Sequence, residues 1–176
     1  MIGKPAAPAF GPGYRIEPLG QDHDRASFRC GVAELDAYLQ QQAGQDLKRN
    51  LAAVFVLTPD GKTVAGFYTL SAHSIQAAEL PEDLRKKLPR FPLPVTLLGR
   101  MAVAQALRGQ GCGEFLLMHA LERAWLGSRQ VASWAMIVDA KAGARDFYIK
   151  YGFIPFPEQP YRLFLPMKTV ERLFEK

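Results

Sequence analysis

A short stretch of the chain places three glycines at every second position, directly after an arginine. It reads LRGQGCGEF and covers residues 107–115. An apolar run precedes it and helix-forming residues follow it, which puts the glycines at the start of a predicted helix. The first amides of a helix carry partial positive charge and lack partners within the helix, and glycines let a ligand oxygen come close to them. The spacing therefore indicates a backbone site for phosphate groups.

Residue identity excludes two common phosphate loops. A nucleotide P-loop requires Gly-x-x-x-x-Gly-Lys-Ser/Thr, and no Lys-Ser/Thr pair follows these glycines. A dinucleotide fingerprint built on Gly109 and Gly111 requires glycine at position 114, where the chain has Glu114. The pattern that remains is Arg108-x-x-Gly111-x-Gly113. The alternative interpretation is that the glycines serve only to form a turn.

Two elements must position these glycines. The apolar run VTLLGRMAV, residues 95–103, is predicted to be a buried central strand. The segment GEFLLMHALERAWLG, residues 113–127, is predicted to be a helix with Leu117, Leu121 and Ala124 on one apolar face. A strand, a glycine-rich turn and a helix in this order are what a phosphate site on a helix N-terminus requires.

The rest of the chain alternates between strand and helix patterns. Strands are predicted over residues 14–19, 52–57, 63–75, 131–140, 153–156 and 161–166. Helices are predicted over residues 31–50, 81–88, 142–151 and 169–176. This order favours an α/β (α+β) sandwich with a mixed sheet.

Composition excludes several classes of protein. The 176 residues are 48% hydrophobic and 22% charged, which is typical of a globular protein that buries a full core. Residues 1–13 are expected to be a flexible arm without the apolar run of a signal peptide, and residues 14–176 a single domain. The two cysteines, Cys30 and Cys112, form no disulfide framework and fit a reducing cytosol.

We expect neither a metal site nor a membrane span. No Cys/His cluster has the spacing of metal ligands, and no stretch approaches 18 consecutive apolar residues. The net charge of +5 permits an anionic partner without requiring one.

Extended over residues 97–117, the pattern LLGRMAVAQALRGQGCGEFLL resembles the core motif of the GNAT acetyltransferases, which use acetyl-CoA. The resemblance implies the GNAT fold, a mixed central sheet with splayed central strands and flanking helices. It implies that acetyl-CoA enters between the strands near 101–103 and 135–139, and that the amides of residues 109–114 hold the pyrophosphate. The cofactor-binding residues expected from it are Met101, Ala102, Val103, Arg108, Gly109, Gln110, Gly111, Cys112, Gly113, Glu114, Asp139 and Phe147.

A second GNAT feature is a tyrosine near the coenzyme sulfur, which corresponds by position to Tyr148 in ARDFYIKYGF, residues 144–153. The resemblance implies that an amine attacks the thioester directly, without an acetylated enzyme, and that the leaving thiolate gains a proton. A phenol with a pKa of about 10 can give that proton to a thiolate, whose thiol has a pKa of about 8.5, only with help from geometry. We expect Tyr148 to be the general acid. The alternative is a core aromatic, although its neighbour Phe147 is the stronger candidate for the core.

No general base is evident among His73, His119 and Glu114. His119 falls in the middle of a predicted helix and is expected to be a buried or rim histidine. An α-amine has a pKa near 8, whereas a lysine side chain has a pKa of about 10.4. The α-amine is already partly neutral at pH 7, so the lack of a base favours an α-amine acceptor.

A narrower resemblance extends over residues 28–168. The segments FRCGVAELDAYLQQQAGQDLKRN, GFYTLSAHSI, LPRFPLPVTLLGRMAV and DFYIKYGFIPF look like the GNAT toxins of bacterial toxin–antitoxin modules. The resemblance implies acetylation of the amino group of aminoacyl-tRNA in the cytoplasm, inhibition of translation, a ribbon-helix-helix antitoxin and a homodimer. The chain departs from the pattern at Ala104, where these toxins commonly have Asp, and at Cys112, which is usually aliphatic.

Basic side chains are the candidates for contact with tRNA phosphates. They are Lys48, Arg49, Arg85, Lys86, Lys87, Arg90, Arg100 and Lys150. The alternative for these residues is an ordinary solvated surface. Two other functions stay open: a GNAT enzyme that acetylates a small amine or a protein N-terminus, and a non-catalytic module that binds coenzyme A or a partner.

Overall fold

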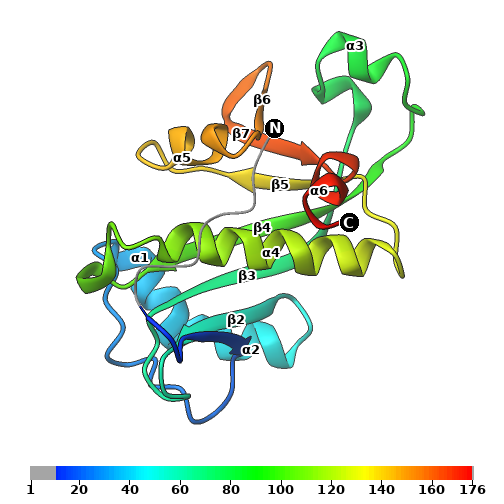
Figure 1. The fold of residues 1–176 in the computed structure, drawn as a ribbon. Helices are drawn as coiled ribbons and strands as arrows, with labels where there is room; N and C mark the ends of the chain where they lie inside the picture. The colour runs from blue at the N-terminus through cyan, green and yellow to red at the C-terminus, as the bar shows by residue number, and fades with distance from the viewer. Residues whose placement is uncertain (1–10, 176) are drawn as a thin grey trace. The chain divides into compact units, whose positions relative to one another are not determined.

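The computed structural model describes residues 11–175, and most of the arm predicted over residues 1–13 lies outside them. Seven strands form one sheet in the order β1-β2-β3-β4-β5-β7-β6 (Figure 1). The strands are β1 (Arg15–Pro18), β2 (Ala53–Thr58), β3 (Gly66–Ile75), β4 (Leu93–Val103), β5 (Ala135–Asp139), β6 (Ile154–Phe156) and β7 (Gln159–Pro166). The α-helices are α1 (Ala33–Ala37), α2 (Ala43–Lys48), α3 (Glu82–Arg85), α4 (Cys112–Ser128), α5 (Arg145–Lys150) and α6 (Met167–Phe174).

The sheet is mixed, as predicted. β4 and β5 pair in parallel, whereas β1–β2, β2–β3, β5–β7 and β6–β7 pair antiparallel. Each strand and helix predicted from the sequence has a counterpart in the structure. The α+β architecture with a mixed sheet and flanking helices is therefore confirmed.

Two short 3₁₀ helices were not predicted. They are η2 (Ala77–Glu79) and η3 (Gln105–Leu107). Each spans only three residues, which is too short to produce a periodic pattern in the sequence.

The described chain forms two compact units. The loop unit comprises residues 11–71 and 99–120, and the tyrosine unit comprises residues 72–98 and 121–175. The names refer to the glycine stretch in the first unit and to Tyr148 in the second.

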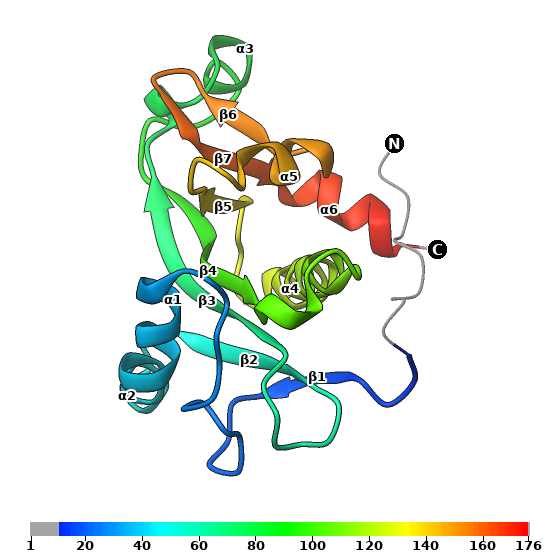
Figure 2. The same ribbon diagram turned by 90° about the vertical axis from the view of Figure 1, so that its left-hand side faces the viewer.

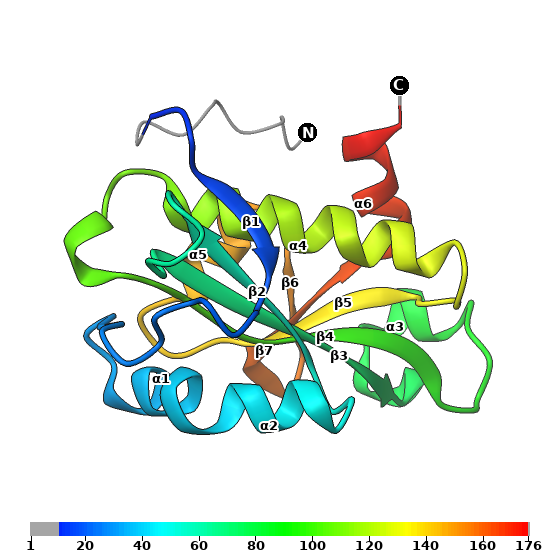
Figure 3. The ribbon, with the colours of Figure 1, turned by 90° about the horizontal axis from the view of Figure 1, so that it is seen from below.

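In the loop unit, α1 and α2 lie on one face of β2 and β3 and the first turns of α4 lie on the other (Figure 2). Phe67 of β3 makes the central contacts, because its ring is 5.5 Å from that of Phe28 and 6.2 Å from that of Tyr38. β1 runs alongside β2 at the edge of this unit (Figure 3). The unit thus has its own apolar core on the α1 side of the strands.

The helix predicted over residues 31–50 is not uniform. A π-helical turn, η1 (Tyr38–Gln42), separates α1 from α2. Tyr38 and Leu39 are its buried residues, and both belong to the core of the loop unit. Apolar periodicity predicted one helix because the π turn changes the backbone bonding without ending the helix.

In the tyrosine unit, β5 is the central strand. Its first four residues are all buried, which explains the continuous apolar run in the sequence. Thr96–Leu98 of β4 pair with Met136–Val138 on one side, and β7 pairs along the other. Phe156 and Phe164 pack edge to face at 5.2 Å in the core of this unit.

Candidate active site

The glycine stretch begins where η3 ends, and two of its glycines have left-handed backbone. Gly109 has φ of +79° and Gly111 has φ of +86°, a conformation that side chains with a Cβ rarely adopt. A Cβ added at either position would meet no atom within 4 Å. Glycine is therefore required here for backbone conformation, and the space over the backbone is open.

Helix α4 starts at Cys112, one residue before the predicted start. Its first hydrogen bond within the helix runs from the amide of Phe115 to the carbonyl of Gly111 at 3.1 Å. Amides ahead of this bond have no acceptor in their own helix and point out of its N-terminus. Gly113 and Glu114 stand in this first turn, next to the half-buried Gln110. The geometry is that of a helix N-terminus available to an anion.

Cys112 anchors the start of α4 in the core. Its side chain is 1% exposed, and burial raises the pKa of its thiol. A small apolar side chain serves the same purpose, so the departure from the aliphatic residue of the toxin pattern leaves the helix start intact.

The end of β4 is held closely against the neighbouring backbone. Met101 and Val103 are half-buried and Ala102 is buried. A Cβ added at Gly66 of β3 would lie 2.9 Å from the carbonyl oxygen of Ala102 and 2.8 Å from Leu116 of α4. Glycine at position 66 thus permits the close packing of β3, β4 and α4 next to the glycine stretch.

Arg108 is exposed overall, but its guanidinium contacts the protein backbone. Its guanidinium Nη2 donates a hydrogen bond to the backbone carbonyl of Cys30 and lies against Gly31. Three residues earlier, the amide of Gln105 donates to the carbonyl of Arg29 at 2.8 Å. Both bonds tie the residues before the glycines to the segment that leads into α1.

Tyr148 lies on α5 in the tyrosine unit and is 5% exposed. Its ring packs edge to face against Phe147 at 5.2 Å and Phe153 at 5.5 Å. Burial raises the pKa of its phenol. Gly152, with φ of +93°, ends the helix as the sequence predicted.

The expectation that Phe147 is more buried than Tyr148 is wrong. Tyr148 is buried, whereas Phe147 is half-buried and packs against Tyr148 and Tyr151. Successive residues of a helix point about 100° apart, so a helix as short as α5 turns only one of two adjacent rings fully inward. Apolar character alone did not identify which one.

Asp139, at the end of β5, lies in a charged cluster of the tyrosine unit. Its carboxylate accepts a bond from Nε of Arg162 at 3.0 Å, and Glu79 lies 4.0 Å from the same guanidinium. Nε2 of His73 is 3.4 Å from Nη2 of Arg162. Arginine can only donate, so His73 accepts through the lone pair that a base would use. This contact makes His73 a poor candidate for the general base.

His119 is a packed histidine, as expected. Its Nδ1 is 2.6 Å from the hydroxyl of Tyr68, and its ring lies 5.7 Å from that of Phe55. Glu114, the third candidate base, stands in the first turn of α4.

The structure brings three of the predicted tRNA contacts together. A cavity of about 560 Å³ in the tyrosine unit is lined by Arg85, Lys86 and Arg90, together with apolar side chains that include Leu88. Lys86 forms an exposed ion pair with Glu82 at 3.2 Å. Within the described chain, the guanidinium groups of Arg85 and Arg90 have no hydrogen bond or ion pair.

The other predicted tRNA contacts lie elsewhere. Lys87 is exposed beside α3 but does not line the cavity. Lys48 and Arg49 are exposed at the end of α2 in the loop unit. Lys150 is on α5, with its amine 5.5 Å from the ring of Tyr151.

Arg100 takes part in a contact that the sequence did not predict. Its guanidinium lies 3.7 Å from the centre of the Tyr38 ring, and its amide donates to the hydroxyl of Thr69 at 3.0 Å. The Tyr38 hydroxyl donates to Asp46 at 2.8 Å, and Gln42 donates to the same carboxylate at 2.9 Å. Burial and the bond to Asp46 raise the pKa of Tyr38 to about 12. No sequence motif links these residues, which come from η1, α2, β3 and β4.

No group of three or more His, Cys, Asp or Glu side chains in residues 11–175 is arranged to hold a metal ion. No helix in the same range is long and apolar enough to cross a membrane.

The chain is similar in sequence to a known domain family and to two bacterial proteins. The family model of the acetyltransferase (GNAT) domain matches residues 50–155. The probable toxin TacT of Sinorhizobium fredii strain NGR234 is 35% identical over 169 residues, which cover 90% of this chain and 93% of that protein. A tRNA-acetylating toxin of Mycobacterium tuberculosis is 35% identical over 151 residues, which cover 85% and 90%.

Solved structures agree with these relatives. AtaT in complex with acetyl-methionyl-tRNAfMet has a TM-score of 0.84 at 33% identity, covering 92% of this chain and 99% of that one. A Tyr-to-Phe mutant of AtaT bound to the C-terminus of the antitoxin AtaR and acetyl-CoA has a TM-score of 0.79 at 29% identity, with coverage of 93% and 99%. The mixed sheet, the glycine-rich start of α4 and the matched family model together show that the chain belongs to the GNAT family of acetyltransferases.

Proposed function

We propose that the protein is the toxin of a toxin–antitoxin pair, which transfers the acetyl group of acetyl-CoA to the α-amine of an aminoacyl-tRNA. Acetylation of that amine removes the nucleophile needed for peptide bond formation, so translation stops. Similarity to tRNA-acetylating toxins over more than four fifths of the chain supports this function. The open glycine stretch at the start of α4 is the observation that carries the cofactor part of the proposal.

In this proposal, acetyl-CoA binds by backbone contacts. The amides of residues 109–114 hold the pyrophosphate, helped by the positive end of α4. The backbone of Met101, Ala102 and Val103 bonds the pantetheine arm. The left-handed glycines favour this role, because a Cβ added at Gly109 or Gly111 would meet no atom of the described residues within 4 Å.

Tyr148 acts on the leaving sulfur. Its raised pKa means that the phenol is protonated at neutral pH, the state that a general acid needs. It also makes the phenol a weaker acid than a thiol, whose pKa is about 8.5. Tyr148 therefore donates a hydrogen bond to the sulfur from the start, and the proton moves only as negative charge develops there.

The acceptor amine needs little help from a base. An α-amine has a pKa of about 8 and is partly neutral at pH 7. His73 accepts from Arg162 and His119 bonds Tyr68, so neither is an obvious base for this step. The α-amine of an aminoacyl-tRNA fits these constraints better than a lysine side chain.

The cavity lined by Arg85, Lys86 and Arg90 is the candidate contact for tRNA phosphates. The guanidinium groups of Arg85 and Arg90, which have no side-chain partner among residues 11–175, are available for bidentate bonds to phosphate oxygens. We further propose that the protein acts in the cytoplasm, where charged tRNA occurs, and that it pairs with a DNA-binding ribbon-helix-helix antitoxin. The AtaT toxin, in complex with its antitoxin and DNA, is similar in structure to this chain. The homodimer stays a prediction.

The direct test is transfer of label from radioactive acetyl-CoA to a panel of charged tRNAs. We expect label on the amino acid of at least one charged tRNA and none on the uncharged tRNA. Parallel reactions contain small amines and peptides with free N-termini at the same concentration. Label on those acceptors alone would replace the tRNA substrate with a small amine or a protein, and no label anywhere would contradict the enzymatic function.

A further inference from the structure

The side chain of Arg108 is already committed to a protein partner. Its Nη2 donates to the carbonyl of Cys30, and the guanidinium lies on the backbone of Gly31. Gly31 has φ of +87°, and a Cβ added there would lie 2.7 Å from Nη2 and 3.5 Å from Cζ of Arg108. Glycine favours this backbone, and a Cβ here would displace the guanidinium from its position. The backbone of Cys30 and Gly31 thus forms the contact site of Arg108, which we call the Cys30–Gly31 seat.

The seat is itself firmly attached to the loop unit. The amide of Cys30 donates to the carboxylate of Asp36 on α1 at 2.8 Å. The carbonyl of Phe28 accepts from the side chain of Gln40 in the π turn at 3.1 Å. These two bonds fix the segment on either side of its contact with Arg108.

The glycines that follow Arg108 have no comparable support. A Cβ at Gly109 or Gly111 would meet no atom within 4 Å, and the next buried anchor is Cys112. Glycine also loses more conformational freedom than any other residue when it is fixed. The shape of the stretch between Arg108 and Cys112 therefore depends on how firmly its two ends are held.

We propose that Arg108 is a positioning residue, which holds the glycine stretch in its binding shape through the Cys30–Gly31 seat and does not bind the pyrophosphate with its own charge. The inference rests on the proposed place of the pyrophosphate on residues 109–114. Loss of the contact between Arg108 and Cys30–Gly31 leaves residues 109–111 conformationally free. Acetyl-CoA must then order these residues when it binds, which weakens binding.

A double-mutant cycle tests this role. Arg108→Gln, Gly31→Ala and the double variant are titrated with acetyl-CoA by calorimetry. Each single change is expected to raise the Kd about tenfold, the loss for one hydrogen bond to a charged group. The double variant is expected to bind no worse than the weaker single variant, because both changes break the same contact. Hydrogen exchange at the amides of 109–114 in the free protein is expected to become faster in all three.

Salt dependence separates positioning from direct charge contact. An exposed guanidinium that binds pyrophosphate is screened by salt, so its removal would flatten the dependence of Kd on ionic strength. The positioning role predicts the same dependence in the wild type, Arg108→Gln and Gly31→Ala. Arg108→Lys, which keeps the charge, is a second variant should Arg108→Gln fail to fold. We expect it to recover only part of the affinity, because its ammonium cannot lie flat on Gly31.

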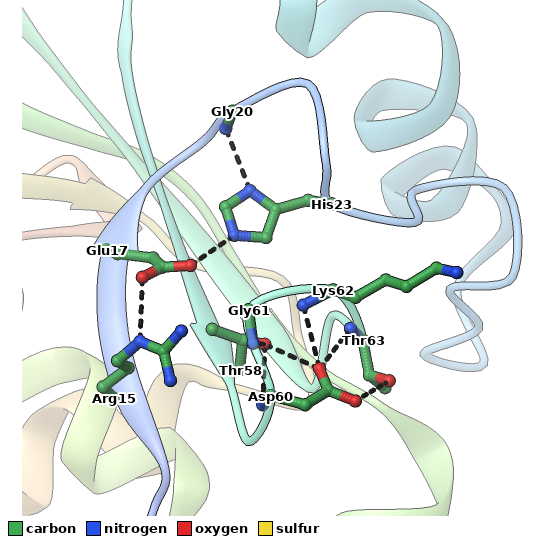
Figure 4. Close-up of polar contacts among 9 residues, drawn as sticks. All are labelled: Arg15, Glu17, Gly20, His23, Thr58, Asp60, Gly61, Lys62 and Thr63. Carbon is green, nitrogen blue, oxygen red and sulfur yellow. Dashed lines mark hydrogen bonds and ion pairs between the residues drawn. The ribbon is translucent and has the colours of Figure 1, made fainter.

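The chain offers a matched control in the turn between β2 and β3 (Figure 4). Gly61 has φ of +80°, and a Cβ there would lie 2.7 Å from Nη2 of Arg15. Gly61→Ala and Arg15→Gln therefore repeat the same strain and the same loss of charge away from the glycine stretch. They are expected to lower the melting temperature but to leave the Kd of acetyl-CoA unchanged.

Three results would overturn the inference. One is normal affinity in Gly31→Ala together with weak, salt-insensitive binding in Arg108→Gln, which would indicate direct contact with phosphate. Another is full additivity in the cycle. The third is unchanged affinity in both single variants. In that case Gly111→Ala separates the two proposals. Weakened acetyl-CoA binding in Gly111→Ala means that only the positioning role of Arg108 is wrong. Unchanged binding means that the proposed pyrophosphate site is wrong as well.

Discussion

Burial gives Tyr148 two properties that act in opposite directions. It keeps the phenol protonated at physiological pH, and it makes the proton harder to release. Rings of Phe147 and Phe153 pack on the tyrosine and hold its orientation. In the proposed mechanism, a donor held in this way stabilises the developing thiolate without prior reorganisation.

Replacement of Tyr148 by Phe tests whether the phenolic hydroxyl acts as the general acid. Tyr148→Phe keeps the packed ring and removes only the hydroxyl, so we expect normal binding of acetyl-CoA. The rate of acetyl transfer is expected to fall by about 10²–10⁴-fold, the usual contribution of a general acid. Kinetics with labelled acetyl-CoA measure the rate, and calorimetry measures the binding. Full activity in this variant would remove Tyr148 from the mechanism.

The same burial predicts how stability depends on alkaline pH. A phenol whose folded pKa is raised stabilises the fold fully below its unfolded pKa of about 10, and this contribution is lost as pH rises toward the folded value. The free energy of unfolding is therefore expected to fall above pH 10. Tyr148→Phe should reduce this loss of stability at high pH. Tyr38→Phe should reduce it between about pH 10 and about pH 12. Urea denaturation at several pH values measures the effect, and equal slopes in wild type and variants would contradict it.

At the scale of elements, the start of α4 combines an open backbone with a buried anchor. Gly109 and Gly111 expose the chain, whereas Cys112 fixes the first turn of the helix in the core. The π turn η1 also holds a side chain in the core. Its residue Tyr38 is buried, stacks on Phe67 and lies under the guanidinium of Arg100. Both features depend on backbone outside the regular α-helix, which is left-handed at the glycines before α4 and π-helical in η1.

Gly111, just before α4, and Gly127, in its last turn, form a natural pair for mutagenesis. Gly111 and Gly127 both have open space where a Cβ would stand, but only Gly111 has a positive φ. Gly111→Ala strains the backbone by about 1–2 kcal/mol in the binding shape and is expected to weaken acetyl-CoA binding by about tenfold. Gly127→Ala favours helix by about 0.5–1 kcal/mol and should raise the melting temperature without a change in affinity. Calorimetry and thermal unfolding measure the two effects, and equal responses of the two variants would contradict the assignment.

At the scale of the whole molecule, the net charge of +5 is less informative than the state of each cation. Arg162 is neutralised by Asp139 and Glu79, and Arg108 is committed to the Cys30 carbonyl. Arg85 and Arg90 have no such partners within the described chain and line one cavity. Cations without protein partners are the ones able to bind an external phosphate at little cost.

Removal of both cavity arginines is expected to affect the tRNA acceptor and not the cofactor. We expect Arg85→Gln/Arg90→Gln to raise the KM for charged tRNA by about tenfold and to make binding less sensitive to salt. The Kd of acetyl-CoA should not change. Arg129→Gln, which removes an exposed cation beside Trp125, is the control for net charge. An unchanged KM in the double variant, or an equal rise in the control, would exclude the cavity as a specific contact.

The sequence alone predicted the succession of strands and α-helices and the start of α4 to within one residue. These features can be read from residues close together in sequence, without knowledge of the fold. They are the apolar periodicity, the glycines that end helices and the spacing of Arg108, Gly111 and Gly113. The glycine stretch could therefore be predicted as a backbone site for phosphate, with the strand before it and the helix after it. The π turn was missed because it changes the bonding of a helix and not its apolar pattern.

Only the tertiary structure decided what the side chains do. The partner of Arg108 is a carbonyl 78 positions away, and the need for glycine at position 31 follows from that contact. The burial of Tyr148 instead of Phe147, and the cavity that gathers Arg85 and Arg90, likewise depend on the packing of distant segments. A sequence specifies such contacts through the fold as a whole, because no local spacing encodes which backbone carbonyl or cavity a long side chain will reach.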